Sequence, residues 1–543
     1  MKQLYYNGTI VTVNDSYPLA EALLVEDGKI CAIGSLEDVQ ALQDEETTLV
    51  DLAGKTVLPG FIDGHGHIGN PAVSMPRLDP PPNGDIDSKE KLFKKIKEYI
   101  SEGLVLESGW LICSGYDNAF FENNAHPTRE ELDELSTDIP MLVLHASNHV
   151  ACINSKAMEV IGWTKDTKDP EGGVLQRDPM TGELNGVIEE KAVQMVGYNF
   201  ALKDLSMEFM AKLFVDAQKF YAQQGVTTAQ EGGTIASSMA MMNYCQKKNQ
   251  FIIDIVSYPF QDYIPEKILD DSPEQGYENH LKIAGAKLVA DGSPQAKTAW
   301  LTEPYYVKPE NTEEGYKGYP IFSDDQMLAF CKEALEHNWQ MLVHCNGDAA
   351  GDQFIHAYRQ AQRETGNFND LRPVMIHAQT VREDQLDAMK EIGMMPSYFH
   401  DHVFYWGDYH YESALGPERG SRISPLATTA KRSIPFTLHN DMPVTPINPL
   451  FNIHNAVNRV TRNGQKLGQE YCVDVMEAIK AVTIYGAYQY FDESIKGSLE
   501  VGKLADMVIL DKNPLTVPKE TIKDIKVLET IKEGKMIYKC ECY

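Results

Sequence analysis

The most constraining stretch of this chain is VLPGFIDGHGHI at residues 57–68. It begins as an apolar run, which indicates a buried strand, and it ends with His65 and His67 on either side of one glycine. Side chains alternate faces along a strand, so residues i and i+2 point the same way. We therefore expect both imidazoles to aim at one point, where glycine leaves room for close approach. Imidazole is the commonest protein ligand of transition metals.

An isolated His-x-His pair is more often a surface hairpin, so the later residues decide between the two interpretations. Several predicted strands end in a residue that can bind a metal, namely His344, His377 and Asp441, and Lys287 lies inside the apolar strand 283–290. In a parallel barrel all strands have their carboxyl ends at one mouth, where active sites are built. A core histidine, an N-cap aspartate or a snorkelling lysine would explain each residue alone. Their joint placement favours a common site.

The middle of the chain alternates between helix and strand signals. Residues 206–224 predict a helix that leads into a strand, and Ser323 begins a capping box for another such helix. Thr380, three residues before Glu383, is predicted to cap a third helix. Repeated strand-then-helix units imply a parallel sheet, and about eight of them close a (β/α)8 barrel. The expected fold class is therefore α/β, with a TIM-like barrel.

Both chain ends read as short strands, unlike the middle. Asp27-Gly28 is a hairpin-turn dipeptide inside the run 21–34. We expect the two ends to form one small β-sandwich, of residues 1–57 and 497–543, beside a barrel of residues 58–496. The region of about 70–205 is rich in proline and asparagine and interrupts the alternation, so it is interpreted as an insertion after the first barrel strand. Its role is left open.

Composition excludes some classes of partner. The net charge is −30, from 79 acidic and 49 basic residues, which disfavours binding to nucleic acid or to an anionic membrane. No apolar run approaches the ~20 residues that span a bilayer, and the first residues lack the apolar core of a signal peptide. The nine cysteines are scattered without zinc-ribbon or redox spacing. We expect a cytoplasmic protein.

The motifs together resemble a known family, the metal-dependent amidohydrolases of the YtcJ-like branch, which includes N-substituted formamide deformylases. The resemblance runs from end to end of the chain and keeps the family's order of motifs. It implies a TIM-like barrel with an outlying β-sandwich and one or two divalent metals, usually zinc. The matching segments are PGFIDGHGH at 59–67, KLVADGSPQAKTAWLTEPYY at 287–306, LVHCNGDAAGDQ at 342–353, IHAQT at 376–380, HNDMPV at 439–444 and GSLEVGKLADMVILD at 497–511.

The resemblance also implies roles for the strand-end residues. It makes His65 and His67 metal ligands of the first strand, and His344 and His377 ligands of the fifth and sixth strands. Asp441 matches the aspartate of the last strand, and it would act as general base and then as general acid. A histidine near the substrate carbonyl, with His377 as the candidate, would help to hold the tetrahedral oxyanion.

Lys287 matches a lysine that is carboxylated in many relatives and then bridges two metals. Carboxylation turns a cation into an anionic oxygen ligand, and burial lowers the pKa of a lysine so that its amine can react with carbon dioxide. N6-carboxylysine at Lys287 is therefore a hypothesis. Without it we expect one metal, held by the histidines and Asp441.

The substrate pocket is predicted with less support from the sequence. His149 and Glu190 resemble family positions near the substrate, and Ser293 follows the lysine strand. His402 matches a histidine common in the family, within an aromatic loop that also contains Trp406. A packed lid without ligand contact is the alternative for that loop. Glu231 follows a strand where relatives have an aspartate, and its role is left open.

The leading hypothesis is hydrolysis of a carbon–nitrogen bond in a small amide-like substrate, such as an N-substituted formamide or an acyl amide. A deaminase or a cyclic-amide hydrolase would use the same metal site. The non-enzymatic alternative is a barrel scaffold that binds ligand without turnover, which the full ligand set disfavours. Barrels of this kind often pair, so a homodimer is one alternative, although no segment of the sequence marks an interface.

Overall fold

The computed structural model describes residues 2–81, 84–147, 150–170, 172–261, 276–309 and 312–541. Contacts divide the chain into two compact units. The first contains Met1–His67, Gln218–Asp441 and Ile447–Tyr543, and the second contains Ile68–Ala217 and Met442–Pro446. Each unit is described below by itself.

Parallel strands form the centre of the first unit, in two sheets of order β16-β15-β14-β8 and β17-β18-β19-β20-β21. A parallel bridge between Phe260 and Lys287 lies where the two sheets meet. Their strands are apolar because helices cover them, as parallel sheets require. The strands are β8 Phe61–Ile62, β14 Val226–Thr234, β15 Asp254–Pro259, β16 Leu281–Ile283, β17 Gly285–Val289, β18 Gln340–Cys345, β19 Val374–His377, β20 Met395–Tyr398 and β21 Thr437–Leu438.

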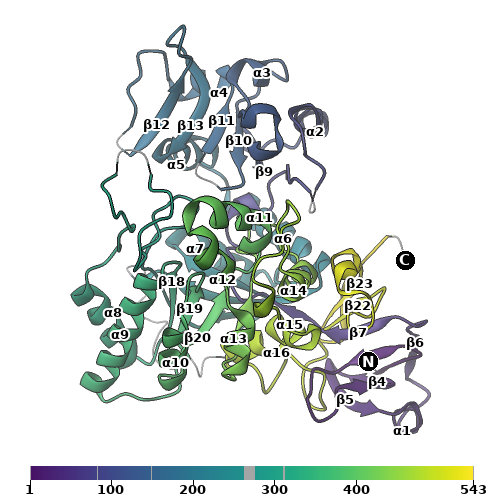
Figure 1. Cartoon of the computed structure of the whole chain (residues 1–543). Helices are drawn as coiled ribbons and strands as arrows, with labels where there is room; N and C mark the ends of the chain where they lie inside the picture. The colour runs from purple at the N-terminus through teal and green to yellow at the C-terminus, as the bar shows by residue number, and fades with distance from the viewer. Residues whose placement is uncertain are drawn as a thin grey trace. The chain divides into compact units, whose positions relative to one another are not determined.

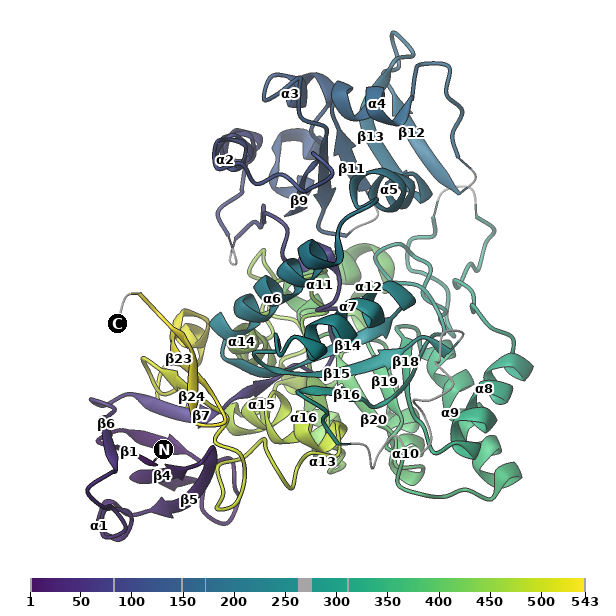
Figure 2. The ribbon, with the colours of Figure 1, turned by 180° about the vertical axis from the view of Figure 1, so that it is seen from behind.

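Helices connect these parallel strands and lie on their outer side (Figures 1 and 2). The predicted helix 206–224 is observed as α6, and Ser323 caps α8 through the predicted capping box with Gln326. The α/β prediction is therefore confirmed. The helices of this part are α6 Met207–Gln223, α7 Ala236–Lys247, α8 Asp324–Glu336, α9 Asp348–Thr365, α10 Glu383–Glu391, α11 His402–Tyr409, α12 Gly416–Arg422, α13 Leu426–Lys431, α14 Pro449–Asn458, α15 Val475–Ala481 and α16 Ile484–Gln489.

Three local predictions are wrong. The first strand ends at Ile62, so the two histidines of the opening stretch follow the strand instead of lying on it. Thr380 does not cap α10, because the helix begins at Glu383 and Arg382 occupies the N-cap position; the Thr380 hydroxyl donates to the Asn346 carbonyl. The aromatic segment is a helix, α11, whose apolar residues pack inward, and it is not a loop.

The two chain ends lie side by side in the first unit (Figure 1). Strand β22, from the C-terminal part of the chain, pairs with β7, the strand before β8 and the two histidines. On its other side β7 pairs with β2. The predicted Asp27-Gly28 turn joins β4 to β5, with positive φ at both residues. One sheet has the order β5-β4-β1-β6 and the other β24-β23-β22-β7-β2-β3. The strands are β1 Lys2–Tyr6, β2 Thr9–Val11, β3 Leu19–Ala20, β4 Ala22–Glu26, β5 Lys29–Gly34, β6 Thr48–Asp51, β7 Thr56–Pro59, β22 Met507–Leu510, β23 Val527–Lys532 and β24 Lys535–Lys539, and α1 is Leu36–Gln40.

The second unit is built on a sheet of order β12-β13-β11-β10-β9. Its strands β9 and β10 are parallel, and the other neighbours are antiparallel. Two apolar clusters form its core, one containing Trp110 and Leu142 and the other containing Tyr116 and Val143. The strands are β9 Leu111–Tyr116, β10 Met141–His145, β11 Val150–Ile153, β12 Gly173–Arg177 and β13 Leu184–Glu190, and the helices are α2 Lys89–Ser101, α3 Arg129–Asp133, α4 Ser155–Ile161 and α5 Lys191–Val196.

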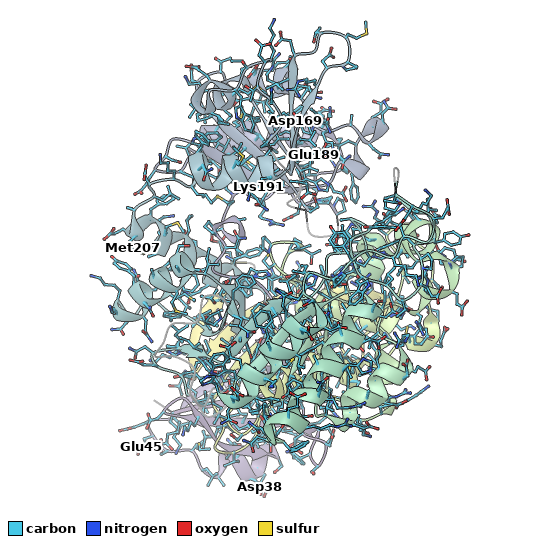
Figure 3. All side chains as sticks on the ribbon, turned by 90° about the vertical axis from the view of Figure 1, so that its left-hand side faces the viewer. Asp38, Glu45, Asp169, Glu189, Lys191 and Met207 are labelled. Carbon is cyan, nitrogen blue, oxygen red and sulfur yellow. The ribbon has the colours of Figure 1, made fainter. Side chains whose placement is uncertain are left out.

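The excess of negative charge lies on the surface. Asp38, Glu45 and Asp169, for example, are exposed and project outward (Figure 3). None of the helices in the described ranges combines the length and the apolar composition needed to cross a membrane.

Buried ion pairs connect the last strands to the parallel sheets. Lys532 of β23 lies 2.7 Å from Asp254 Oδ2 at the start of β15 and 2.9 Å from Asp506 Oδ2, and Lys496 also pairs with Asp254. These side chains are almost completely buried. Since a buried charge is tolerated only when it is paired, each partner depends on the others.

We expect Lys532→Met to destabilise the protein by about 3 kcal/mol, because Asp506 would lose its cation in a buried setting. Thermal unfolding followed by circular dichroism measures the effect. Lys523→Met is the matched control, since Lys523 pairs with Asp524 at the surface and such pairs contribute under about 1 kcal/mol. Equal melting temperatures for the two variants would contradict the prediction.

Candidate active site

Six predicted site residues come from the carboxyl ends of the parallel strands or the residues that follow. His65 and His67 follow β8, Lys287 lies in β17, and His344 lies in β18. The remaining two are His377, the last residue of β19, and Asp441, which follows β21. Both have a positive φ, 69° and 55°, which non-glycine residues rarely adopt and which often accompanies functional sites.

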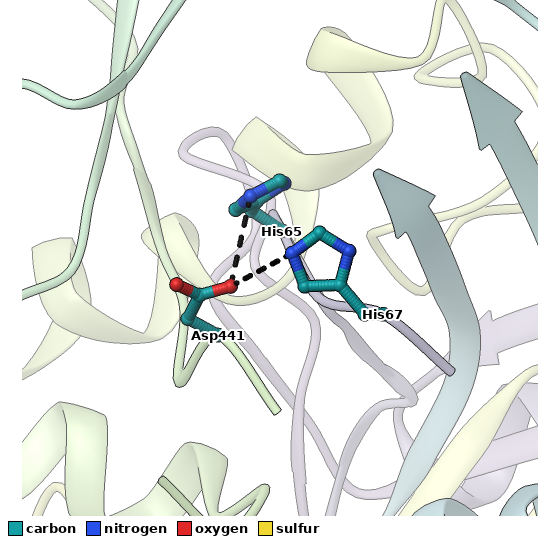
Figure 4. A group of neighbouring side chains, drawn as sticks. All are labelled: His65, His67 and Asp441. Carbon is teal, nitrogen blue, oxygen red and sulfur yellow. Dashed lines mark ion pairs between the residues drawn. The ribbon is translucent and has the colours of Figure 1, made fainter. Parts of the chain in front are cut away.

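The six side chains converge on one region. His67 Nε2 lies 3.3 Å and His65 Nε2 3.7 Å from Asp441 Oδ1 (Figure 4), and His377 Nε2 lies 4.0 Å from Asp441 Oδ2. Lys287 Nζ lies 3.2 Å from His65 Nε2, and His344 Nδ1 lies 3.0 Å from His377 Nε2. His65, His67 and Asp441 place their ligating atoms within 4.8 Å of one another, which suits a shared metal ion.

Hydrogen bonds fix which nitrogen of His65 faces this region. The Gln230 amide nitrogen donates to the Gly64 carbonyl at 3.0 Å, so the Gln230 oxygen is the atom that faces His65 Nδ1, at 2.6 Å. An amide oxygen only accepts, so Nδ1 carries the hydrogen and Nε2 keeps its lone pair. Gly232 leaves room for this ring, because a Cβ atom there would lie 2.4 Å from His65 Cε1.

The ring of His344 is oriented through its Nε2 atom, which contacts neighbouring polar groups. Its Nε2 lies 3.1 Å from the Gly292 carbonyl, which also accepts from the Asn346 amide at 2.9 Å. The Asn346 amide nitrogen, a donor, also lies 3.0 Å from Nε2, so Nε2 faces both an acceptor and a donor, while Nδ1 faces His377 Nε2 at 3.0 Å. Outer partners of this kind orient the histidines of metal sites.

The charges of the group are strongly coupled. Burial lowers the pKa of Lys287 to about 8, despite the opposing charge of Asp441. Burial also lowers the pKa of His344 to about 4, with a contribution from the charge of Lys287. For His67, burial lowers the pKa, but the contact with Asp441 and the charges of Asp441 and Glu231 raise it by more. For Asp441, burial raises the pKa, and the contact with His67 and the nearby cations more than reverse this. The aspartate is therefore anionic at neutral pH.

One residue of the group was missed in the sequence. His439 follows β21, is fully buried, and places Nε2 3.3 Å from His377 Nδ1, with its ring centroid 5.2 Å from that of His65. Its position two residues before Asp441 was the available signal, because this is the same i, i+2 spacing that singled out the first pair. Glu231, whose role the sequence left open, is buried and bridges the backbone of His67.

The predicted substrate residues fall into different places. Trp406 and His402 of α11 pack on Phe399, whose ring lies 5.5 Å from that of His439, so this aromatic group adjoins the histidines. Ser293 lies in a turn, where its backbone carbonyl accepts from Thr298. Glu190 ends β13 in the second unit, and His149 lies outside the described residues.

Comparison with known proteins identifies the family. The profile of the amidohydrolase family matches residues 48–538. The chain belongs to the amidohydrolase family. Putative amidohydrolase YtcJ of Bacillus subtilis (strain 168) is 25% identical over 99% of this chain and 99% of its own length. N-substituted formamide deformylase of Arthrobacter pascens is 24% identical over 98% of this chain and 97% of its own. The predictions of this family, and of an enzyme instead of a scaffold, are confirmed.

The fold is similar to that of a solved structure. An uncharacterized metal-dependent hydrolase from Pyrococcus horikoshii OT3 has a TM-score of 0.74 and 23% identity, covering 96% of this chain and 99% of that one. At 23% sequence identity this similarity shows the fold alone. The parallel strands described above agree with it.

We expect Gly232→Ala to destabilise the protein by about 1–3 kcal/mol, because the new methyl group overpacks the ring of His65. Gly197→Ala is the control, because its Cβ would meet no atom within 4 Å. Thermal unfolding of both variants measures the difference. An unchanged melting temperature for Gly232→Ala would mean that the His65 ring is not held where the structure places it.

Proposed function

We propose that this enzyme hydrolyses a carbon–nitrogen bond of a small amide-like substrate, using at least one divalent metal, with zinc as the first candidate. The observation that carries the proposal is the convergence of His65, His67, His344, His377 and Asp441 at one rim of strand ends. A surface hairpin or unrelated core histidines would not place four imidazoles and one carboxylate together.

The residues fit a metal. Among the described side chains, Asp441 Oδ1 is buried without a well-aligned hydrogen-bond donor, although two histidine nitrogens lie within 4 Å. His65 Nε2 keeps its lone pair because its other nitrogen donates to the Gln230 oxygen. Nitrogen and oxygen ligands of this kind suit zinc. Lys287 lies beside His65, where a carboxylated side chain would provide the oxygens that a second ion needs.

We propose further that the parallel strands close into a (β/α)8 barrel, with the β-sandwich of the chain ends beside it. The bridge from Phe260 to Lys287 supports continuity at one junction of the sheets. At the other junction, the Thr437 hydroxyl lies close to Gly64. A Cβ atom added to Gly64 would be 2.5 Å from Thr437 Oγ1. In the chain ends, strands of both sheets contribute to one apolar cluster that includes Leu23 and Ile509.

The mechanism follows from the positions of the side chains. When bound, a divalent metal supplies a water of lowered pKa and polarises a carbonyl oxygen. Asp441 is anionic and faces the histidines, so it can take the proton of the attacking water and later deliver it to the leaving nitrogen. His377, as one of the histidines that would hold the metal, would help to stabilise charge that develops on the carbonyl oxygen through that ion. His65, His377 and Asp441 are buried, which strengthens these interactions, whereas the side chains of His67 and His344 are 28% and 20% exposed, on the side open to a substrate.

The relatives favour the substrate class. The deformylase from Arthrobacter pascens is named for N-substituted formamides and aligns over nearly the whole chain. In this chain the aromatic rings of Phe399, His402 and Trp406 adjoin the histidines, which suits an apolar substituent on the amide nitrogen. We therefore expect N-substituted formamides or acyl amides as substrates, with formate or a carboxylate as one product. Release of ammonia would instead indicate a deaminase.

Asp441→Asn should leave the fold intact and lower kcat by about 10²–10⁴-fold, because an amide cannot accept the proton of the attacking water. Turnover of a panel of N-formyl and N-acyl amines, with products identified by mass spectrometry, measures the effect. Asp408→Asn is the control, since Asp408 accepts from Thr461 and lies outside the convergent group. Turnover near that of the unaltered enzyme would refute Asp441 as the base.

Removal of divalent ions should abolish turnover without unfolding the protein. Dialysis against a chelator, followed by addition of Zn²⁺ or Mn²⁺, tests this with the same substrate panel and with elemental analysis. We expect turnover to return in proportion to the metal bound. Full turnover in metal-free protein would refute the metal centre.

Carboxylation of Lys287 is testable by isotope labelling. The lowered pKa of about 8 leaves a substantial fraction of neutral amine near pH 8, and only the neutral amine reacts with carbon dioxide. With ¹³C-bicarbonate we expect a carbamate signal in the carbon NMR spectrum that Lys287→Met removes. A bare ammonium at Lys287 in an electron-density map of metal-loaded crystals would exclude the modification.

A further inference from the structure

A cluster of buried polar side chains adjoins Asp441. Its centre is Asn440, which precedes Asp441 in the chain and is completely buried. The Asn440 amide nitrogen donates to Asp401 Oδ2 at 2.7 Å. The Asn440 side-chain oxygen accepts from the backbone N–H of Asn448 at 2.9 Å and from the Asn452 amide at 3.1 Å. Both ends of this amide group therefore have partners in the protein.

The backbone fixes the orientation of the Asn440 amide. The Asn448 N–H can only donate, so the atom of Asn440 that faces it is the oxygen. The amide nitrogen is then the atom that faces Asp401, and an ionised carboxylate can only accept. The contact is therefore a donor facing an acceptor, and turning the amide over would break the hydrogen bonds at both of its ends.

Asp401 depends on neutral donors. Its buried carboxylate accepts from the amides of Asn440 and Asn455. Burial raises the pKa of Asp401 to about 7, and the hydrogen bonds from the two amides act in the opposite direction. A buried carboxylate that loses one of its donors is left partly unpaired, which is unfavourable. The contact with Asn440 is therefore costly to break from either side.

The cluster joins the segment after β21 to two helices. Asp401 is the N-cap residue of α11, which carries the aromatic residues of the predicted substrate pocket. Asn448 is the N-cap residue of α14, and Asn452 and Asn455 share one face of that helix, because residues i and i+3 are neighbours. Through Asn440, side chains from both helices hold the backbone that leads out of β21.

The backbone at Asp441 needs such support. Its φ of 55° is one that a non-glycine residue rarely adopts, and such a conformation persists only where the surroundings determine it. Before Asn440, the His439 N–H donates to the Tyr398 carbonyl at 3.1 Å. After Asn440, Asp441 turns its carboxylate towards two histidines (Figure 4). The side chain of Asn440 anchors the residue between these two points.

We propose that Asn440 is a positioning residue, which holds the backbone so that the Asp441 carboxylate is aimed at the histidines, and that Asp401 is the acceptor on which it depends. This inference rests on the proposed function, in which Asp441 is the base. Because Asp401 also begins α11, the same contact sets the base relative to the aromatic rings of that helix. The pair acts as one donor facing one acceptor, whichever of the two residues carries the charge.

Exchanging the two residues tests the pair. Asn440→Asp keeps the oxygen that accepts from Asn448 and Asn452 but places a second carboxylate at the 2.7 Å contact with Asp401. Adding Asp401→Asn turns an amide nitrogen towards the new carboxylate, while its oxygen still accepts from Asn455. With the amine panel, we expect Asn440→Asp to lower kcat by about 10–100-fold, to leave KM within about threefold, and the double variant to recover most of the loss.

A second measurement needs neither turnover nor metal. Hydrogen–deuterium exchange of the metal-free full chain, followed by mass spectrometry, reports the opening of residues 437–441. We expect exchange there to be about tenfold faster in Asn440→Asp, because a hydrogen bond to a charged group is lost. In the double variant it should return towards that of the unaltered protein.

Asn154→Asp is the matched control. Asn154 is also completely buried, and its amide nitrogen donates to the carbonyls of Ser136 and Ile139 in the second unit. The new carboxylate would face two acceptors there, so the melting temperature should fall. Both kcat and exchange at residues 437–441 should stay as in the unaltered protein.

The outcomes separate the two proposals. A double variant no better than Asn440→Asp in kcat and exchange, failure of both to fold, or equal exchange at 437–441 in Asn440→Asp and Asn154→Asp would overturn the role of Asn440. Folding of the double variant where Asn440→Asp does not fold would support the pair. Recovery of exchange in the double variant, with no turnover by any variant or by the unaltered protein, would support the positioning and refute the hydrolytic function.

Discussion

The candidate site depends on a constraint that is simple in physical terms: a carbonyl oxygen accepts hydrogen bonds and never donates them. The Gly64 carbonyl therefore decides, through the Gln230 amide, that Nε2 is the nitrogen of His65 that keeps its lone pair. Neutral imidazole is ambiguous by itself, since either nitrogen can carry the hydrogen. Burial of His65 removes the water that would allow both forms, so the backbone beside this strand end determines the chemistry of this ligand.

Much of this arrangement was predictable because it follows from periodicity and topology. Alternating helix and strand signals indicate parallel strands, and parallel strands bring their carboxyl ends to one edge. That was sufficient to group His344, His377 and Asp441 with the first histidine pair, although hundreds of residues separate them in sequence. The capping box at Ser323 and the Asp27-Gly28 turn were equally local, and the structure has both.

What the sequence did not indicate depends on contacts between distant segments. The His-x-His pair was expected on a strand, yet β8 ends at Ile62, and the bridge from His67 to Glu231 holds the second imidazole in place. Thr380 fits a capping box by spacing, but α10 begins two residues later than that spacing requires, with Arg382 at the N-cap position. His439 was passed over because its partner, Ser397, lies in another strand and only the fold brings them together.

The pairing of β7 with β22 has a consequence for the order in which this protein matures. β7 leads directly into the histidines of the opening stretch, and its neighbour β22 consists of Met507–Leu510, close to the other end of the chain. During synthesis the ribosome releases β7 long before its neighbour β22. A nascent chain therefore carries its first two metal-ligand candidates next to a strand that is paired on one side only, with β2, until Met507–Leu510 has been made.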